Sequence, residues 1–275
     1  MPRLLVITGP TAVGKTACAV QTAREFGTEI ISCDSRQFYR EMRIGVARPS
    51  DEELAAVPHH FVACRSVTEP YNIYGYREDA FRVLRALFRR HDTVVVVGGS
   101  GLYIDALLHP VAPMPDPAPG LRTRLQQMPL EEKRALLLRL DPDYYARVDL
   151  RNPVRLQRAL EVCLTTGRPY SAVVARRTGP TEEWQTEVRV IGMDRAVLRD
   201  RIDRRVDAMM QEGLLDEVRS LLPYRHLNTL NTVGYRELFP VLDGQAQFDE
   251  AVAAIKLNTW HYARKQMTWM RRYAQ

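Results

Sequence analysis

Short apolar runs alternate with longer amphipathic segments along the first part of the chain. The runs at 4–8, 29–33 and 93–97 have the length and composition of buried strands. Between them, 15–26 and 76–90 carry apolar side chains at helical spacing, which predicts amphipathic helices. Strands that alternate with helices in this way predict a parallel α/β sheet.

The composition changes after residue 109. Prolines crowd the segment 109–120, which predicts a stiff exit from the core. Helical patterns follow at 130–140, 142–148 and 153–166; the last has Asn152 as N-cap, Pro153 at its first position and Gly167 at its end. An apolar strand returns at 188–193, before helices at 195–211 and 249–273. We therefore predict a core in two parts, 1–115 and 186–275, around a helical insertion domain at 116–185.

The overall composition excludes several classes of protein. With 45% hydrophobic and 26% charged residues, the 275-residue chain can bury a sizeable core and is not disordered. No apolar run approaches the length of a membrane span, and Met1 leads directly into the first strand, so we expect neither a membrane anchor nor a signal peptide. Cys18, Cys33, Cys64 and Cys163 form no metal-type pair, so reduced thiols and a cytoplasmic location are expected.

The formal net charge is +6, and arginine carries nearly all of the positive charge because lysine occurs only at positions 15, 133, 256 and 265. Arginine suits phosphate recognition, and a basic balance is a first indication of a nucleic-acid partner. An arginine bias of the whole genome would produce the same composition. The composition alone does not separate these two explanations.

Residues 9–16 read GPTAVGKT and stand between a predicted strand and a predicted helix, which is the setting of a P-loop. Its backbone N–H groups and the start of the helix can surround phosphate oxygens. Lys15 would add a point charge, and the Thr16 hydroxyl would be placed to ligate Mg²⁺. The predicted phosphate-binding residues are Gly9, Pro10, Thr11, Ala12, Val13, Gly14, Lys15 and Thr16.

Asp34 ends the second predicted strand, at the edge of the sheet where ligands bind in doubly wound folds. A carboxylate there can act as a general base or as an Mg²⁺ ligand, and a turn cap is the simpler alternative. The third strand ends in Gly98 and Gly99, with no carboxylate of the kind that holds Mg²⁺ in motor and switch ATPases. This pattern favours a transferase that binds phosphate over a nucleotide-driven machine.

Arginines gather in three places. The first group, Arg151, Arg155 and Arg158, shares one helix face. The second group lies on the helix predicted at 195–211. Because aspartates interleave with its arginines, a face that is merely exposed to solvent is an equal alternative to a binding site. The third group mixes aromatic and basic residues over 260–273, which suits phosphate contact and base stacking as well as an amphipathic helix that closes the core. The second group comprises Arg195, Arg199, Arg201, Arg204 and Arg205.

These motifs, in this order, resemble the tRNA dimethylallyltransferases (tRNA isopentenyltransferases) of the bacterial form, since no zinc-finger extension follows Gln275. The resemblance implies a P-loop NTPase-like core and transfer of a dimethylallyl group from dimethylallyl diphosphate to N6 of the adenosine just 3′ of a tRNA anticodon. The P-loop would then hold the diphosphate rather than ATP. The matching segments are GPTAVGKT at 9–16, ISCDSRQFYREMRIG at 31–45, GGSGLY at 98–103, NPVRLQRALE at 152–161, NTVGYREL at 231–238 and ARKQMTW at 263–269.

The same resemblance implies roles for individual residues. Asp34 matches the general base, Arg205 matches an arginine that neutralises the departing diphosphate with Lys15, and Thr16 would hold Mg²⁺. Ser100 matches a family position near the reacting adenine. Segment 45–49 departs from the family pattern at Val46 and Arg48, where Thr and Lys are usual.

The resemblance also implies which residues touch the tRNA anticodon stem-loop. The adenine must leave the loop's stack to reach the base, and the insertion and last helix would grip phosphates and shape. The implied tRNA-binding residues are Asp34, Ser35, Arg36, Gln37, Ser100, Arg122, Val154, Arg155, Leu156, Gln157, Arg158, Asn231, Thr232, Val233, Gly234, Tyr235 and Arg236.

Two other functions fit parts of the pattern. A P-loop kinase for a small molecule or a nucleoside would also place a carboxylate after the second strand. A tRNA-binding module without activity would keep the basic segments, although Lys15, Thr16 and Asp34 are all present. We expect a monomer that acts on tRNA and dimethylallyl diphosphate.

Overall fold

The computed structural model describes residues 1–69, 71–112, 114–175 and 184–273. The chain divides into two compact units. The larger unit combines Met1–Leu108 with Glu182–Gln275, and the smaller unit is His109–Thr181.

Within the described ranges, five parallel strands form one sheet in the order β3-β2-β4-β1-β5. Strand β1 pairs with the central strand β4 on one side and with the edge strand β5 on the other, so that Thr8 lies opposite both Gly98 and Val190. The carboxyl ends of these strands therefore meet at one edge, where the P-loop begins. The strands are β1 (Arg3–Thr8), β2 (Ile30–Ser32), β3 (His59–His60), β4 (Thr93–Gly98) and β5 (Gln185–Val190).

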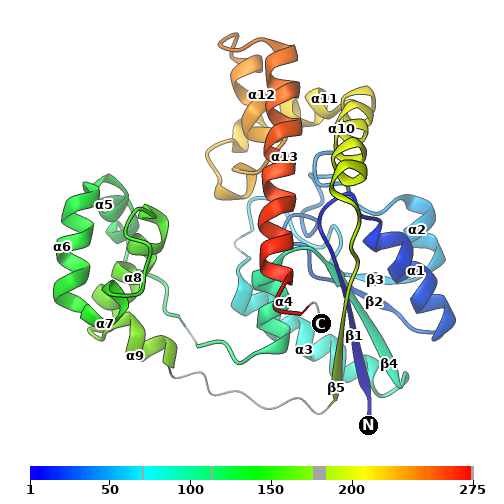
Figure 1. The fold of residues 1–275 in the computed structure, drawn as a ribbon, viewed down its shortest axis with the longest axis horizontal. Helices are drawn as coiled ribbons and strands as arrows, with labels where there is room; N and C mark the ends of the chain where they lie inside the picture. The colour runs from blue at the N-terminus through cyan, green and yellow to red at the C-terminus, as the bar shows by residue number, and fades with distance from the viewer. Residues whose placement is uncertain (70, 113, 176–183, 274–275) are drawn as a thin grey trace. The chain divides into compact units, whose positions relative to one another are not determined.

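Alternate side chains of the central strands enter two separate cores, as the period of a strand requires. Leu5 and Ile7 pack with Ala19 and Ala23 of α1 (Lys15–Glu25) on one face. Leu4 and other alternate residues pack on the opposite face against α3 (Ile73–Leu87) and α4 (Gly101–Leu108). Figure 1 shows these helices around the sheet. The short helix α2 (Asp51–Ala56) follows a capping box formed by Ser50 and Glu53.

The last part of the larger unit adds helices beyond β5 (Figure 1). Two of them, α10 and α13, pack against each other and share a small core with Ala12 and Val13 of the P-loop. The C-terminal helix therefore supports the phosphate-binding loop directly. The elements are α10 (Arg195–Gln211), α11 (Leu214–Ser220), η1 (Leu222–Tyr224), η2 (Asn228–Leu230), α12 (Tyr235–Leu242) and α13 (Phe248–Met270).

The smaller unit is helical, with its own core of leucines that includes Leu125, Leu137, Leu156 and Leu160. The Asn152 side chain accepts the N–H of Arg155 at 3.2 Å to cap α8, as the sequence predicts. The helices are α5 (Leu121–Gln127), α6 (Leu130–Leu140), α7 (Pro142–Tyr145), α8 (Pro153–Thr166) and α9 (Tyr170–Ala175).

The returning strand begins earlier than its apolar run. The sequence predicts a strand at 188–193 after an insertion that ends at 185, whereas β5 starts at Gln185. Its first residues are polar and exposed because β5 is an edge strand, so hydrophobicity does not mark its start. The two-residue strand β3 is also absent from the prediction, since it is too short to carry a period. In the part of the chain that the structure describes, no helix combines the length and apolarity needed to cross a bilayer.

Candidate active site

The P-loop has the backbone geometry that its sequence predicts. Gly14, at the start of α1, has φ of 100°, a conformation that strongly favours glycine, and Ala12 is also left-handed with φ of 66°. A Cβ on Gly9 would lie 2.7 Å from the carbonyl oxygen of Ile191. The loop is therefore tightly curled against β5, with the N–H groups at the start of α1 free of side-chain caps.

Lys15 lies within this curl. Its Nζ donates to the carbonyl oxygen of Pro10 at 2.8 Å. Burial is the main cause that lowers the pKa of Lys15 to about 8; the charge of Asp34 opposes the shift, and the charge of Arg205 adds to it. Among the residues that the structure describes, the nearest hydrogen-bond partner of Lys15 is the neutral carbonyl oxygen of Pro10, so a bound anion would supply the opposite charge.

The C-terminal helix closes the P-loop through Gln266. Its Oε1 accepts the N–H of Thr11 at 2.8 Å, and its Nε2 donates to the carbonyl oxygen of Gly99 at 2.8 Å. A Cβ on Gly99 would lie 2.3 Å from that amide nitrogen, which explains a glycine there. One buried side chain thus links the phosphate loop to the turn that follows β4.

Asp34 follows β2 and begins a tightly bonded turn. Its Oδ1 accepts the N–H of Arg36 at 3.0 Å, so the turn-cap alternative is also realised. The Arg36 Nη1 donates to the carbonyl oxygen of Thr229 at 2.8 Å. Gln37 donates through Nε2 to the carbonyl oxygens of Val46 and Ala47, at 3.3 and 3.0 Å. These contacts fix the carboxylate beside the P-loop.

One large cavity of about 1020 Å³ unites these groups, and all of its lining belongs to the larger unit. Lys15 and Thr16 line it together with Asp34, at the carboxyl ends of β1 and β2. The walls also include segments 43–50 and 231–234, Arg236, and residues of α10 and α13. The cavity is large enough for a polyphosphate together with a second, flat substrate group.

Helix α10 divides its charges between two faces. Arg199 pairs with Asp203 at 3.3 Å and Arg204 with Asp200 at 2.7 Å, which is the solvated-face alternative. Arg201 and Arg205 instead line the cavity. Arg205 Nη1 donates to Thr11 Oγ1 at 3.4 Å, and burial together with Arg201 lowers the pKa of Arg205 below its ordinary value. Within this group, Arg199 and Arg204 form ion pairs on the helix surface, whereas Arg201 and Arg205 belong to the cavity.

Ser100 is buried and acts on the turn that follows Asp34. Its Oγ accepts the N–H of Ser35 at 3.1 Å and donates to the Ser35 hydroxyl at 3.2 Å. Tyr262 of α13 lines the cavity and hydrogen-bonds to Ser100. Although 41% of Tyr262 is exposed, desolvation by the protein around it, followed by the charge of Asp34, raises the pKa of its hydroxyl to about 12. Ser100 therefore supports residues that face the cavity.

The predicted tRNA-binding segment 231–236 lies on the cavity wall, with one exception. Asn231, Thr232, Val233, Gly234 and Arg236 line the cavity. Tyr235 is fully buried, and its ring packs against Gly45. The prediction of a tRNA contact through this side chain is therefore corrected, because the hydrophobic core encloses it.

The predicted tRNA-binding residues of the smaller unit cluster around one acid. Arg122 Nε and Gln157 Nε2 donate to Glu161 Oε1 at 3.2 and 3.0 Å, and Arg158 Nη1 donates to Glu161 Oε2 at 3.1 Å. Arg155 and Val154 are exposed, with Val154 at 74%. Leu156 is fully buried in the leucine core, so a tRNA contact through its side chain is corrected for the same reason as for Tyr235.

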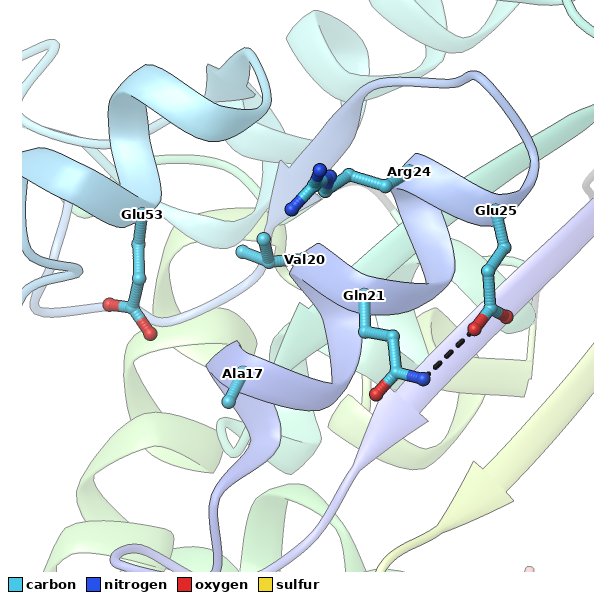
Figure 2. A pocket seen from close by; sticks show the side chains of 6 residues that line it. All are labelled: Ala17, Val20, Gln21, Arg24, Glu25 and Glu53. Atoms are coloured by element: carbon cyan, nitrogen blue, oxygen red, sulfur yellow. Dashed lines mark hydrogen bonds between the residues drawn. The ribbon is translucent and has the colours of Figure 1, made fainter.

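A second, smaller hollow of about 430 Å³ adjoins the cavity along the outer side of α1. Figure 2 shows its side chains on successive turns of α1, with Glu53 facing them from α2. Gln21 donates to Glu25 at 2.9 Å across it. Ala17 and Glu53 are shared with the large cavity. The lining residues are Ala17, Val20, Gln21, Arg24, Glu25 and Glu53.

Sequence reasoning missed three contributors to this site. Gln266 and Tyr262 lie in the basic and aromatic segment 260–273, whose pattern signals a helix but not which residues face the P-loop. The buried positions of α13, including Ala263, Gln266 and Met270, recur at helical spacing, and a polar residue among them is the available signal. The third contributor is Glu217 of α11, which accepts the backbone N–H of Ile44 in the cavity wall. No local sequence pattern marks it, because this partner lies far away in the sequence.

A P-loop core with an acid and two arginines around one polar cavity defines a class of enzyme that transfers groups from phosphate esters or diphosphates. The chain belongs to the IPP transferase family, whose family model matches residues 37–273. The fold predicted from the motifs, and the resemblance drawn from them, are both confirmed.

The similarity to individual relatives extends over nearly the whole length of this chain. The chain is 46% identical to tRNA dimethylallyltransferase 1 of Bacteroides thetaiotaomicron, over 99% of its own length and 89% of that protein. A solved tRNA isopentenylpyrophosphate transferase of Bacillus halodurans is 32% identical with a TM-score of 0.71, over 98% of this chain and 87% of the other. A eukaryotic dimethylallyltransferase acting on tRNA, 24% identical, shares the fold with a TM-score of 0.82 over 98% of this chain and 70% of that one.

Proposed function

We propose that this protein transfers a dimethylallyl group from dimethylallyl diphosphate to N6 of the adenosine 3′ of a tRNA anticodon. One observation carries the proposal most directly: in a chain of the IPP transferase family, Lys15, Thr16 and Arg205 share a single cavity with Asp34. The names of the relatives support dimethylallyl transfer and a tRNA substrate.

The reaction forms one N–C bond, breaks one C–O bond and moves one proton. The N6 nitrogen of adenine attacks the first carbon of the dimethylallyl group, and the C–O bond to the diphosphate breaks. The bonding electron pair leaves with the diphosphate, and the proton from N6 passes to the Asp34 carboxylate. The Arg36 N–H bonded to Asp34 Oδ1 keeps that oxygen in place and leaves the other to accept the proton.

The P-loop would hold the leaving group. Its N–H groups, Lys15 and Arg205 would neutralise the charge that grows on the diphosphate as the bond breaks. The oxygen donors of Thr16 and Asp34 on one cavity wall are of the hard type that suits Mg²⁺, which usually keeps few protein ligands beside phosphate oxygens. We propose that Thr16 would hold Mg²⁺ there. The ion would supply additional positive charge at the diphosphate.

The tRNA would reach Asp34 through an extruded adenine, because the acid lines the cavity and a base within the stacked anticodon loop would not enter it. We propose that residues 34–37, 231–234 and 236, together with Ser100, position the anticodon loop next to the reacting base. In the smaller unit, the cations Arg122, Arg155 and Arg158, with Val154 and Gln157, would contact the stem-loop.

We further propose that the protein acts as a monomer in the cytoplasm. Cys18, Cys33, Cys64 and Cys163 are free thiols in the structure, which suits a reducing compartment. Light scattering of the purified protein with and without an anticodon stem-loop checks the monomer; a stable dimer in both samples would overturn it.

The decisive experiment incubates the protein with unmodified tRNA and dimethylallyl diphosphate labelled in its allyl group. We expect label in the tRNA and on one adenosine after nuclease digestion, and loss of transfer in the Asp34→Asn variant with tRNA binding retained. A parallel reaction with γ-labelled ATP tests the kinase alternative. Label that stays with the small molecule, or phosphate transfer from ATP, would overturn the proposal.

A further inference from the structure

Glu217 of α11 accepts four hydrogen bonds from two distant parts of the chain. Its Oε2 accepts the backbone N–H groups of Arg43 and Ile44, at 3.0 and 2.7 Å. Its Oε1 accepts the N–H of Gly45 at 3.1 Å and the hydroxyl of Tyr235 at 2.6 Å. One carboxylate thus satisfies three successive N–H groups, an arrangement that normally receives an anion.

The neighbours of this carboxylate are shaped to it. A Cβ on Gly45 would lie 2.6 Å from the Tyr235 ring, so only glycine lets the backbone approach this closely. Burial and the adjacent Glu217 raise the pKa of Tyr235, so its hydroxyl is a permanent donor. The interaction therefore has the character of a fixed charge-assisted clamp rather than a surface ion pair.

The clamped chain is a wall of the candidate active site. Segment 43–49 lines the same cavity as the P-loop. Its other end is held by Gln37, whose Nε2 donates to the carbonyl oxygens of Val46 and Ala47. Ala47 adopts a left-handed conformation with φ of 47°, so the segment needs such constraints to keep its shape.

The two constraints connect Glu217 to the proposed base. Gln37 follows Asp34 in the same hydrogen-bonded turn, where the N–H of Gln37 donates to the carbonyl oxygen of Asp34 at 3.2 Å. A displacement of segment 43–49 would therefore move the partner that orients Gln37, and through it the turn that carries Asp34.

We propose that Glu217 is a positioning residue for the group transfer: by clamping segment 43–49, it holds the Asp34 turn in its reactive arrangement. This inference rests on the proposed function. Glu217 contacts no reacting atom, and it acts through the backbone of Arg43, Ile44 and Gly45.

Glu217→Gln is the informative variant because it preserves shape. An amide has a single acceptor oxygen, and its NH₂ group would face either the paired N–H groups or the Gly45 and Tyr235 donors. We expect the single-turnover rate at saturating substrates to fall by about 10- to 100-fold, as for a small misplacement of reacting groups. The dissociation constant of tRNA, measured without dimethylallyl diphosphate, should stay unchanged.

Two more variants test the same clamp with less risk to folding. Tyr235→Phe removes one donor and should lower the single-turnover rate by a smaller factor. The double variant should be no slower than Glu217→Gln alone, because Tyr235 acts through the carboxylate. If Glu217→Gln does not fold, Tyr235→Phe decides. Asp216→Asn is the matched control, since this exposed acid of the same helix pairs with Arg219 alone among the residues that the structure describes.

Three results would overturn the inference. One is an unchanged single-turnover rate in folded Glu217→Gln, or in Tyr235→Phe where that variant decides. The second is a weaker tRNA affinity that accounts for the entire loss, which would make the segment a binding surface only. The third is an equal loss of rate in Asp216→Asn. An inactive wild-type protein would instead refute the proposed function.

Discussion

Gln266 and Thr11 are 255 positions apart, and the side-chain oxygen of Gln266 accepts the backbone N–H of Thr11 at 2.8 Å. The nitrogen of the same amide donates to the carbonyl oxygen of Gly99, so the side chain satisfies one backbone donor and one backbone acceptor. The C-terminal helix therefore sets the shape of the phosphate-binding loop. A loop that binds an anion through backbone N–H groups works only when those groups are already aimed, and this contact aims one end of it.

Gln266→Ala should loosen the P-loop and weaken the fold. The variant leaves the Thr11 N–H and the buried Gly99 carbonyl without partners, and each such group costs about 1–3 kcal/mol. We expect a lower unfolding temperature and a higher KM for dimethylallyl diphosphate, with tRNA affinity little changed. Gln21→Ala is the control, because within the described residues this amide hydrogen-bonds to Glu25 alone, one turn further along the exposed face of α1. An unchanged KM and unfolding temperature in Gln266→Ala would contradict this account.

Adjacent arginines of α10 should differ sharply in their importance. Arg205 is half-buried beside Thr11, whereas Arg204 pairs with Asp200 on the exposed face. Removing a cation that stabilises the leaving diphosphate should cost about 100-fold in kcat/KM for Arg205→Ala, as for an oxyanion donor. Arg204→Ala should retain nearly full activity. Steady-state kinetics of both variants checks this, and equal losses would mean that Arg205 acts only through folding.

The parts of the fold that follow from local pattern were predictable. The strands that became β1 and β4, the helix α10 and the caps of α8 are set by apolar runs and by residues such as Asn152 and Pro153. The P-loop needs glycines at particular positions, so its backbone conformation can be predicted from their spacing in the sequence. The edge strands β3 and β5 escaped prediction in whole or in part because an exposed, short strand has little hydrophobic periodicity.

The candidate site was predictable only where a motif carried it. Asp34 follows a strand, and the position of a strand end is visible in the sequence. The partners of Gln266 and Glu217 are brought near by tertiary packing, which one sequence does not reveal. Burial also separates neighbours that a motif groups together: Tyr235 enters the core while Arg236 faces the cavity, because the start of a helix turns adjacent side chains in different directions.

In the smaller unit, Glu161 should determine how strongly the arginines bind RNA. Its carboxylate is nearly buried and accepts from Arg122, Gln157 and Arg158, which fixes two cations in one arrangement. Burial would raise the pKa of Glu161, but the hydrogen bonds from Gln157 and both arginines outweigh it and hold the pKa below its usual value.

Glu161→Gln should therefore lower the affinity for an anticodon stem-loop by about tenfold, since a charge-assisted contact is worth about 1.5–3 kcal/mol. Fluorescence anisotropy at several salt concentrations measures it. Glu131→Gln serves as the control, because this exposed acid pairs with Arg134 on the surface of α6. Affinity that rises in Glu161→Gln would show instead that the acid restrains the arginines from the RNA.

The pH dependence of diphosphate binding should report on Lys15. Its pKa is lowered to about 8 in the folded protein, so the side chain is mostly charged at neutral pH and loses its proton as the pH rises through 8. Only the charged form attracts the diphosphate, so KM for dimethylallyl diphosphate should be low below this pH and should rise above it. Lys15→Arg keeps its charge throughout, and any activity that it retains should lack this rise. Initial rates from about pH 7 to about pH 9 test the prediction, and a flat KM in the wild-type protein would show that Lys15 does not titrate in this range.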